Sequence, residues 1–142
     1  MISATGAHTS TTTISTTSNS TTSTTTRGTN MIIISGVISI PPEKRAACIE
    51  ASIPLQQATR DDEPGCSAYV FSADPCDAGA IAVYELWDDA PSLAAHFLHK
   101  NYFNMRDMFG QQGITGAVTH KYRIDAVATV YNADRIATTD FD

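Results

Sequence analysis

Two histidines, His96 and His99, are the side chains of this sequence best suited to proton transfer. An imidazole has an ordinary pKa of about 6.5, so it exchanges protons near neutral pH. His96 follows Leu93 by one helical turn and precedes Phe97. Its side chain therefore either packs in the core, hydrogen-bonded to backbone, or serves as a general base. The spacing of the two histidines also fits a two-histidine metal site on one side of a helix, but no third ligand stands at a suitable spacing, so we expect no metal.

Glu85 and Trp87 precede the histidines in a segment that alternates like a strand. Trp87 is either a core anchor or a flat wall against which an aromatic ligand stacks. Glu85 shares the strand face of Trp87, and a buried carboxylate must be paired or protonated. We expect a salt bridge from Glu85 to Lys121, Arg123 or a cation of a partner chain, and a catalytic role is the alternative.

Other aromatic residues could line a ligand site. Tyr69 and Tyr102 each serve packing or donate a hydroxyl hydrogen bond to a ligand oxygen. Phe97 lines either the core or a pocket. His120 is expected on the exposed face of a later strand.

The elements that position these groups begin at residue 31. The apolar, β-branched run 31–40 predicts a buried strand, which stops at two prolines. Residues 43–62 predict a helix that Pro54 kinks or breaks, and 63–65 predict a turn. The apolar residues that indicate the helical period are Ala46, Ile49 and Ile53.

Two strands are predicted next, at 66–73 and 80–87. Asp88 can cap the helix that follows. We expect this helix to break near residues 100–101, to resume, and to end between Gly110 and Gly113.

The predicted order of elements is β-α-β-β-α-β, with a fourth strand at 117–125 and a short final strand at 126–131. This order is the ferredoxin-like α+β arrangement. Both faces of strand 80–87 are largely apolar, although two helices can cover only one face of the sheet. We therefore expect a homodimer in which two sheets pack face to face.

Three motifs follow one another through this predicted domain. They read Glu63-Pro64-Gly65-Cys66-x-x-Tyr69-x-Phe71, Val83-Tyr84-Glu85-x-Trp87-x-Asp89 and Leu93-Ala94-Ala95-His96-Phe97. With them, the chain resembles the antibiotic biosynthesis monooxygenase (ABM) domain family and its quinol monooxygenase-like members over about residues 31–125. The resemblance implies a ferredoxin-like protomer, a dimeric α/β barrel, and a pocket between the sheet and helices of each protomer.

The resemblance also implies a reaction, the oxidation of a hydroquinone or another electron-rich aromatic by O2 without metal, flavin, haem or other cofactor. The catalytic base would be His96, which would take a phenolic proton. The substrate-binding residues would be Trp87, Tyr69, Phe97, Tyr102 and Glu85.

Two positions depart from particular branches of the family. Polyketide quinone-forming members have Asn four residues before the tryptophan, where this chain has Val83. Haem-degrading members have Asn in the first strand, where this chain offers Ser35, and this argues against haem degradation. The alternatives to the monooxygenase are an isomerase of a small carbonyl metabolite and a non-catalytic dimer that binds an aromatic metabolite.

Composition divides the 142 residues into one domain and two tails. The first 30 residues hold 19 Ser or Thr and one charged residue, Arg27, so residues 1–30 are expected to be a disordered tail or a start-site artefact. The predicted domain is 31–131, and 132–142 form a C-terminal tail.

Charge and cysteine content narrow the partners and the compartment. Nine basic against fifteen acidic residues, a net charge of −6, argue against nucleic-acid binding. No apolar stretch approaches the ~20 residues of a membrane span, and the start has no signal-peptide pattern. Cys48, Cys66 and Cys76 lack C-x-x-C spacing, so we expect reduced thiols and a cytoplasmic protein.

Overall fold

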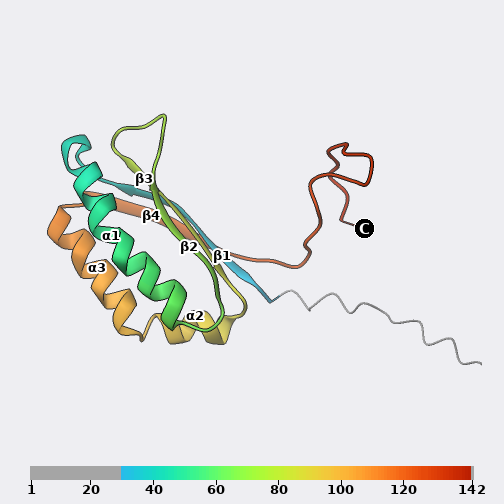
Figure 1. Cartoon of the computed structure of the whole chain (residues 1–142), viewed down its shortest axis with the longest axis horizontal. Helices are drawn as coiled ribbons and strands as arrows, with labels where there is room; N and C mark the ends of the chain where they lie inside the picture. The colour runs from blue at the N-terminus through green and yellow to red at the C-terminus, as the bar shows by residue number, and fades with distance from the viewer. Residues whose placement is uncertain (1–29, 142) are drawn as a thin grey trace, which may run out of the picture.

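The computed structural model describes residues 30–141, so the disorder expected for residues 1–29 lies outside the described part. The elements follow the order β1 (Ile32–Ser39), α1 (Pro42–Asp62), β2 (Cys66–Ala73), β3 (Ala80–Trp87), α2 (Ala90–His96), α3 (Lys100–Gln112) and β4 (Gly116–Arg123). The helices form one layer against one face of the sheet (Figure 1). This arrangement confirms the ferredoxin-like α+β prediction, with the second predicted helix divided into α2 and α3.

The sheet has the order β2-β3-β1-β4, and every neighbouring pair is antiparallel. Glu85 of β3 lies opposite Tyr69 of β2 on one side and Ile34 of β1 on the other. Ile34 in turn lies opposite Lys121 of β4. Opposite residues point to the same face, so this register places Tyr69, Glu85 and, two residues on, Trp87 beneath the helices.

Helix α1 continues through Pro54, so of the two predicted effects, a kink or a break, the break is wrong and the kink stays a prediction. Pro54 is exposed, so its ring meets solvent and the missing N–H leaves one helix carbonyl without its usual donor. The inner face also differs from the apolar pattern, because Ala46 and Ile53 are exposed and Ser52, Gln56 and Thr59 are buried.

Polar side chains of α1 explain this choice of face. The Gln56 side chain donates to the Phe71 carbonyl at 3.1 Å and accepts from the Phe71 N–H at 3.0 Å. The Arg60 guanidinium donates to the Tyr69 carbonyl. Since β2 is an edge strand, these bonds satisfy backbone groups that lack a strand partner, and they fix α1 on β2.

The start of α2 and the gap before α3 differ slightly from the sequence prediction. Asp89, rather than Asp88, caps α2 by accepting the Ser92 N–H at 2.8 Å. Asp88 instead accepts a hydrogen bond from Ser67, which ties it to the start of β2. The predicted helix break falls at 97–99, and α3 ends at Gly113 with a left-handed φ of 79°.

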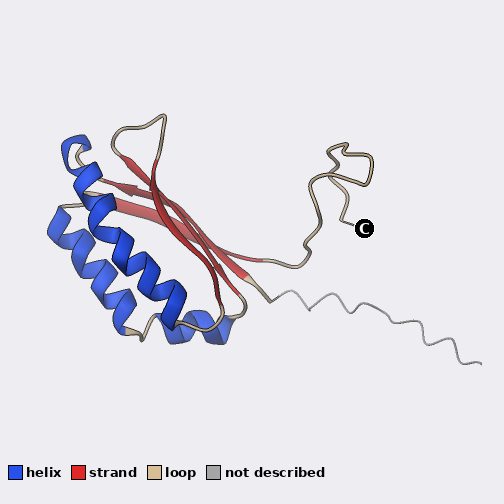
Figure 2. Ribbon diagram, viewed as in Figure 1, coloured by secondary structure: helices blue, strands red, loops and turns tan. Residues whose placement is uncertain are grey.

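The predicted final strand at 126–131 is wrong. Strand β4 ends at Arg123, opposite Ile32, which is the first residue of β1. One further hydrogen bond, from the Ile124 N–H to the Met31 carbonyl at 2.9 Å, follows this pair, and residues 125–141 then leave the sheet (Figure 2). They form a turn closed by one bridge between Tyr131 and Ala137, in which Asn132 accepts two backbone N–H groups.

The core lies between the sheet and the helices, and no helix within residues 30–141 covers the opposite face of the sheet (Figure 2). That outer face carries exposed apolar side chains, among them Val37, Tyr84, Val118 and Tyr122. All three cysteines are free thiols. Cys48 is fully buried as expected, whereas Cys66 is half-buried.

Candidate functional site

His96 and Glu63 form a buried hydrogen-bonded pair. His96 is the last residue of α2, Glu63 directly follows α1, and the distance from His96 Nδ1 to Glu63 Oε2 is 2.7 Å. His96 is only 1% exposed, and the Glu63 side chain is buried as well. A carboxylate at Nδ1 fixes the imidazole tautomer with hydrogen on Nδ1 and a free lone pair on Nε2.

The turn at 63–65 holds Glu63 against α2. The Glu63 N–H donates to the Thr59 carbonyl, which closes α1. Gly65 then takes a left-handed φ of 85°, and a Cβ there would lie 2.2 Å from Ser92 Oγ in the first turn of α2. Glycine therefore serves both the backbone conformation and the close approach of the two segments.

Four aromatic rings surround the His96 imidazole. The ring centroids lie 4.5 Å from His96 for Trp87, 5.4 Å for Tyr102, 5.5 Å for Tyr69 and 5.8 Å for Phe97. Trp87 and Tyr69 are fully buried beneath the helices, whereas Phe97 is 41% exposed. The ring cluster is thus closed toward the sheet and reaches the surface at Phe97.

Glu85 joins this cluster through Trp87, whose indole N–H donates to Glu85 Oε2 at 2.9 Å. Among the described residues Glu85 forms no ion pair, so the expected salt bridge to Lys121 or Arg123 is wrong. The register gives the reason, because β1 lies between Glu85 and Lys121 and two strand spacings span roughly 9.5 Å. Both cations are exposed instead.

Burial and charge set the protonation of these groups. Burial raises the pKa of Glu85 to about 7, and the nearby Glu63 charge acts in the same direction against the Trp87 hydrogen bond. Burial lowers the pKa of His96, although Glu63 opposes this, so the imidazole is neutral at pH 7. Burial and then the charges of Glu85 and Glu63 raise the pKa of Tyr69 far above its ordinary value, so Tyr69 stays a phenol.

Every site residue predicted from the sequence lies in this one cluster. His96 contacts the four aromatic rings, and Glu85 binds one of them. The sequence interpretation missed Glu63, which it assigned only to a turn. A signal was present, because Glu63 is an acid placed directly before Pro64-Gly65 and an apolar strand, where a helix end is turned toward the core.

His99 lies on the other side of Glu63. Its Nδ1 is 3.4 Å from Glu63 Oε1 and accepts the Asn101 N–H at 3.2 Å, which caps α3. The described residues contain no group of three His, Cys, Asp or Glu placed to hold a metal ion. His120 is exposed on β4.

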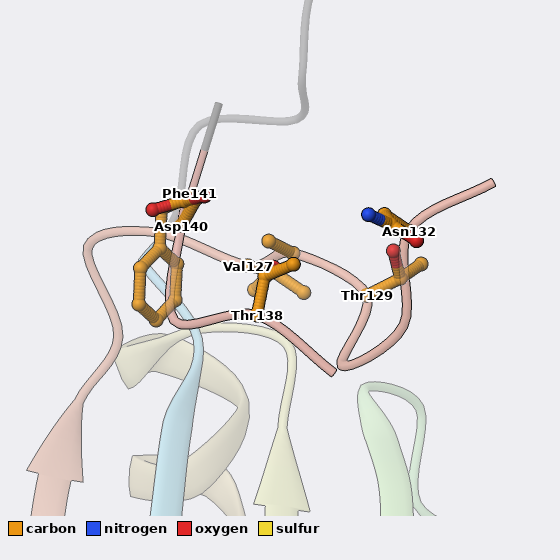
Figure 3. Close-up of a pocket in the computed structure, with 7 residues that line it drawn as sticks. Val127, Thr129, Asn132, Thr138, Asp140 and Phe141 are labelled. Carbon is orange, nitrogen blue, oxygen red and sulfur yellow. The ribbon is translucent and has the colours of Figure 1, made fainter. Parts of the chain in front are cut away.

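Two hollows lie away from this cluster, at the C-terminal segment. One, of about 560 Å³, is lined by residues between Val127 and Asn132 and between Thr138 and Phe141, which face each other (Figure 3). The other, of about 380 Å³, is mainly apolar and lies where this segment meets Ile33 and Leu86. Among the described residues, the titratable side chains that line these hollows are Asp140 and Tyr84, which do not match the acid–base groups of the His96 cluster.

None of the helices in residues 30–141 combines the length and the apolar character that crossing a membrane requires.

Several solved structures share this fold. The structure resembles one from Deinococcus radiodurans, named as a candidate antibiotic biosynthesis monooxygenase, with 23% identity, a TM-score of 0.64, and coverage of 71% of this chain and 99% of that one. A Caulobacter crescentus protein of the same description has 23% identity, a TM-score of 0.62, and coverage of 70% and 92%. A Bacteroides thetaiotaomicron protein of unknown function, named as a possible oxidoreductase, has 22% identity, a TM-score of 0.58, and coverage of 68% and 100%. At these identities the likeness concerns the fold.

No curated protein matches the chain. Residues 31–106, which include the Glu63–His96 pair and most of the helical layer, match the family model described as "Antibiotic biosynthesis monooxygenase". The match spans more than half of the 142 residues, and the chain therefore belongs to the antibiotic biosynthesis monooxygenase family.

Proposed function

We propose that the protein is a cofactor-independent monooxygenase that oxidises a hydroquinone or another electron-rich aromatic with O2. One observation carries the proposal, namely the buried pair of His96 and Glu63 inside a cluster of four aromatic rings. The pair supplies a base with a free Nε2, and the rings supply surfaces on which a flat substrate can stack.

In the proposed reaction, His96 Nε2 takes the phenolic proton of the substrate. The phenolate gives one electron to O2, and recombination of the two radicals forms a ring hydroperoxide. Loss of the ring hydrogen and cleavage of the O–O bond then give a quinone that carries one oxygen atom of O2 as a new ring oxygen, and the other oxygen atom leaves as water. The ring carbon is oxidised, and both oxygen atoms of O2 are reduced.

Proton transfer from phenol to imidazole is uphill. The ordinary pKa values of about 10 and 6.5 correspond to roughly 4.8 kcal/mol. Burial of His96 enlarges this difference, and the Glu63 carboxylate at 2.7 Å reduces it by stabilising the imidazolium. Glu63 is therefore the group that makes His96 usable as a base.

The remaining residues have proposed binding roles. Trp87, Tyr69, Tyr102 and Phe97 would orient the ring and exclude water, which matters because a misplacement of about 1 Å can lower the rate about 10²-fold. Glu85, partly protonated near pH 7, could donate a hydrogen bond to a substrate oxygen.

The test measures oxygen consumption by the chelator-treated full chain with hydroquinones and dihydroxynaphthalenes, corrected for autoxidation. We expect uptake by the native protein, none by His96→Ala, and unchanged uptake by the control Gln111→Ala, which is exposed on α3. Full uptake by a folded His96→Ala variant would remove His96 from the mechanism.

A second candidate is an isomerase of a small carbonyl metabolite. It is favoured by the presence of a neutral base, His96, and an acid with a pKa of about 7, Glu85, in one cluster. An isomerase would turn over without O2, so the same panel extended to carbonyl compounds under nitrogen separates the two reactions.

We also propose that the protein is a homodimer with facing sheets. The support is the apolar outer face of the sheet, which no helix within residues 30–141 covers. Val118→Lys on this face should shift light scattering toward the monomer, whereas Ile53→Lys, on exposed α1, should not. A monomeric native protein would contradict the proposal. The cytoplasmic location stays a prediction.

A further inference from the structure

The Nδ1 hydrogen of His96 has no direct way to solvent, because it is bonded to the buried Glu63 side chain. The His96 side chain is only 1% exposed, and the rings of Trp87, Tyr69, Tyr102 and Phe97 enclose it. When Nε2 takes the phenolic proton, the ring becomes an imidazolium, and Glu63 is the described residue hydrogen-bonded to its Nδ1. We propose that Glu63 and His99 form a proton relay between His96 and solvent. The relay rests on the proposed role of His96 as the base.

The geometry supplies three groups in a row. Glu63 Oε2 lies 2.7 Å from His96 Nδ1, and its other oxygen, Oε1, lies 3.4 Å from His99 Nδ1. Oε1 has no hydrogen-bond donor within the described residues, although it is buried. The side chain of His99 is 33% exposed. The row therefore runs from an enclosed imidazole, through a buried carboxylate, to an imidazole at the surface.

His99 is ready to accept a proton in the resting protein. Its Nδ1 accepts the Asn101 N–H as the N-cap of α3, so this nitrogen carries a lone pair rather than hydrogen. The same nitrogen faces Glu63 Oε1. His99 Nδ1 can thus exchange its contact with the α3 backbone for a hydrogen bond that it donates to Glu63.

The relay moves one proton in balanced steps. Protonated His96 gives its Nδ1 hydrogen to Glu63 Oε2 and becomes neutral. The carboxyl group turns about its last side-chain bond and passes the hydrogen to His99 Nδ1. The His99 ring turns outward, releases this proton to water and returns to its cap. Glu63 and His99 then regain their starting states, and His96 holds the substrate proton on Nε2. When Nε2 gives this proton to the hydroxide that leaves the peroxide, the same steps in reverse return a hydrogen to Nδ1, and no electron moves in the relay.

Other titratable groups near His96 cannot replace this route. Tyr69 of β2 has a strongly raised pKa and is fully buried, so it does not carry a proton to solvent. Glu85 of β3 can take a proton, but it is also buried and its described hydrogen bond leads back to Trp87. Tyr102 of α3 contacts His96 through its ring, edge to face, and none of the described hydrogen bonds joins these two side chains.

The test must separate the relay from the capping role of His99. His99→Asn keeps a side-chain oxygen that caps helices well, but it cannot take the proton. Gln111→Asn, exposed on α3, is the control. In the full chain labelled with ¹⁵N-histidine, NMR gives the rate at which the His96 Nδ1 hydrogen exchanges with water near pH 7, without any substrate.

We expect this exchange to slow at least about tenfold in His99→Asn and not in Gln111→Asn. A tenfold change is below the range of about 10² to 10⁴-fold that a positioned proton donor or acceptor contributes to a reaction rate. Protection of the Asn101 amide from hydrogen exchange should stay unchanged, since the cap is kept. If it falls, His99→Ser repeats the measurement with another capping residue. An exchange rate that is not slowed, in a variant with an intact cap, would overturn the relay.

This measurement is independent of the proposed oxygenase. If native protein shows no oxygen uptake but exchange slows in His99→Asn, the relay stands and the monooxygenase proposal fails. If oxygen is consumed, the His99→Asn rate should depend on the concentration of a small buffer base such as imidazole, and the native rate should not.

Discussion

Glu85→Gln should make the protein more stable at alkaline pH. Glu85 is 6% exposed, and its carboxylate accepts one described hydrogen bond, from Trp87 Nε1 at 2.9 Å. Burial, helped by the charge of Glu63, raises its pKa from 4.5 to about 7. Glutamine resembles the protonated acid in shape, and its side-chain oxygen can accept the same indole hydrogen.

The sign and size follow from linkage. Between pH 4.5 and 7 the folded state holds a proton on Glu85 that the unfolded state releases, so this group lowers stability as pH rises through that range. A difference of about 2.5 pKa units at 1.36 kcal/mol each gives an upper bound of roughly 3 kcal/mol. The loss is complete above pH 7 and absent below pH 4.5.

Urea unfolding of the full chain at pH 4.5 and pH 8.5 provides the assay. Glu85→Gln should match the native protein at pH 4.5 and exceed its unfolding free energy by up to about 3 kcal/mol at pH 8.5. Glu50→Gln, on the exposed side of α1, should show no such difference. An equal effect of Glu85→Gln at both pH values would refute the assignment of Glu85 as a buried acid with a raised pKa.

Three further substitutions test the frame of the site. Glu63→Gln removes the charge that supports His96, so it should lower the rate of oxygen uptake by about 10² to 10⁴-fold. It should also lower the unfolding free energy by about 1.5 to 3 kcal/mol. An uptake rate equal to that of the native protein would contradict the role of the His96–Glu63 pair. Gly65→Ala should destabilise by more than about 1 kcal/mol, because of φ 85° and the contacts with Ser92 Oγ and Cβ. Ser92→Ala should restore only a fraction, since it removes the contact at 2.2 Å with Oγ and keeps the one at 2.6 Å with Cβ. A neutral Gly65→Ala in thermal unfolding would contradict both reasons. Pro54→Ala should stabilise by about 1 kcal/mol or more, since proline inside a helix costs about 3 kcal/mol, and a lower unfolding midpoint would show that Pro54 serves a packing role.

The positions of most strands and helices could be predicted because they depend on local patterns. Strand alternation placed Tyr69 and Phe71 on one face of β2, and both are buried there. The inner face of α1 could not be predicted in the same way. It is chosen by Gln56 and Arg60, whose hydrogen bonds reach the backbone of an edge strand that is distant in the sequence. An apolar pattern carries no information about such partners.

The candidate site, too, could be predicted from the sequence only in part. Aromatic residues and His96 stand out by type, so they could be named from the sequence, and the fold brings their rings together. The partners of the charged groups depend on distances between elements. Glu63 meets His96 across 33 residues of chain, and Glu85 misses Lys121 because β1 separates them. Both outcomes follow from strand order and helix ends, which residue spacing alone does not give.

These two carboxylates differ because their surroundings differ. Glu63 lies between two imidazoles, either of which can neutralise its charge by donating hydrogen. Glu85 has only an indole donor among the described residues, and its ionisation is opposed by burial and by the charge of Glu63. A single aromatic cluster thus places one acid beside a base and holds another acid partly protonated near pH 7. Acid–base chemistry at neutral pH requires pairs of titratable groups whose surroundings shift their pKa values in different directions, as burial does here for His96 and Glu85. Because the charge of Glu63 acts on both groups, removing it should lower the pKa of His96 and of Glu85.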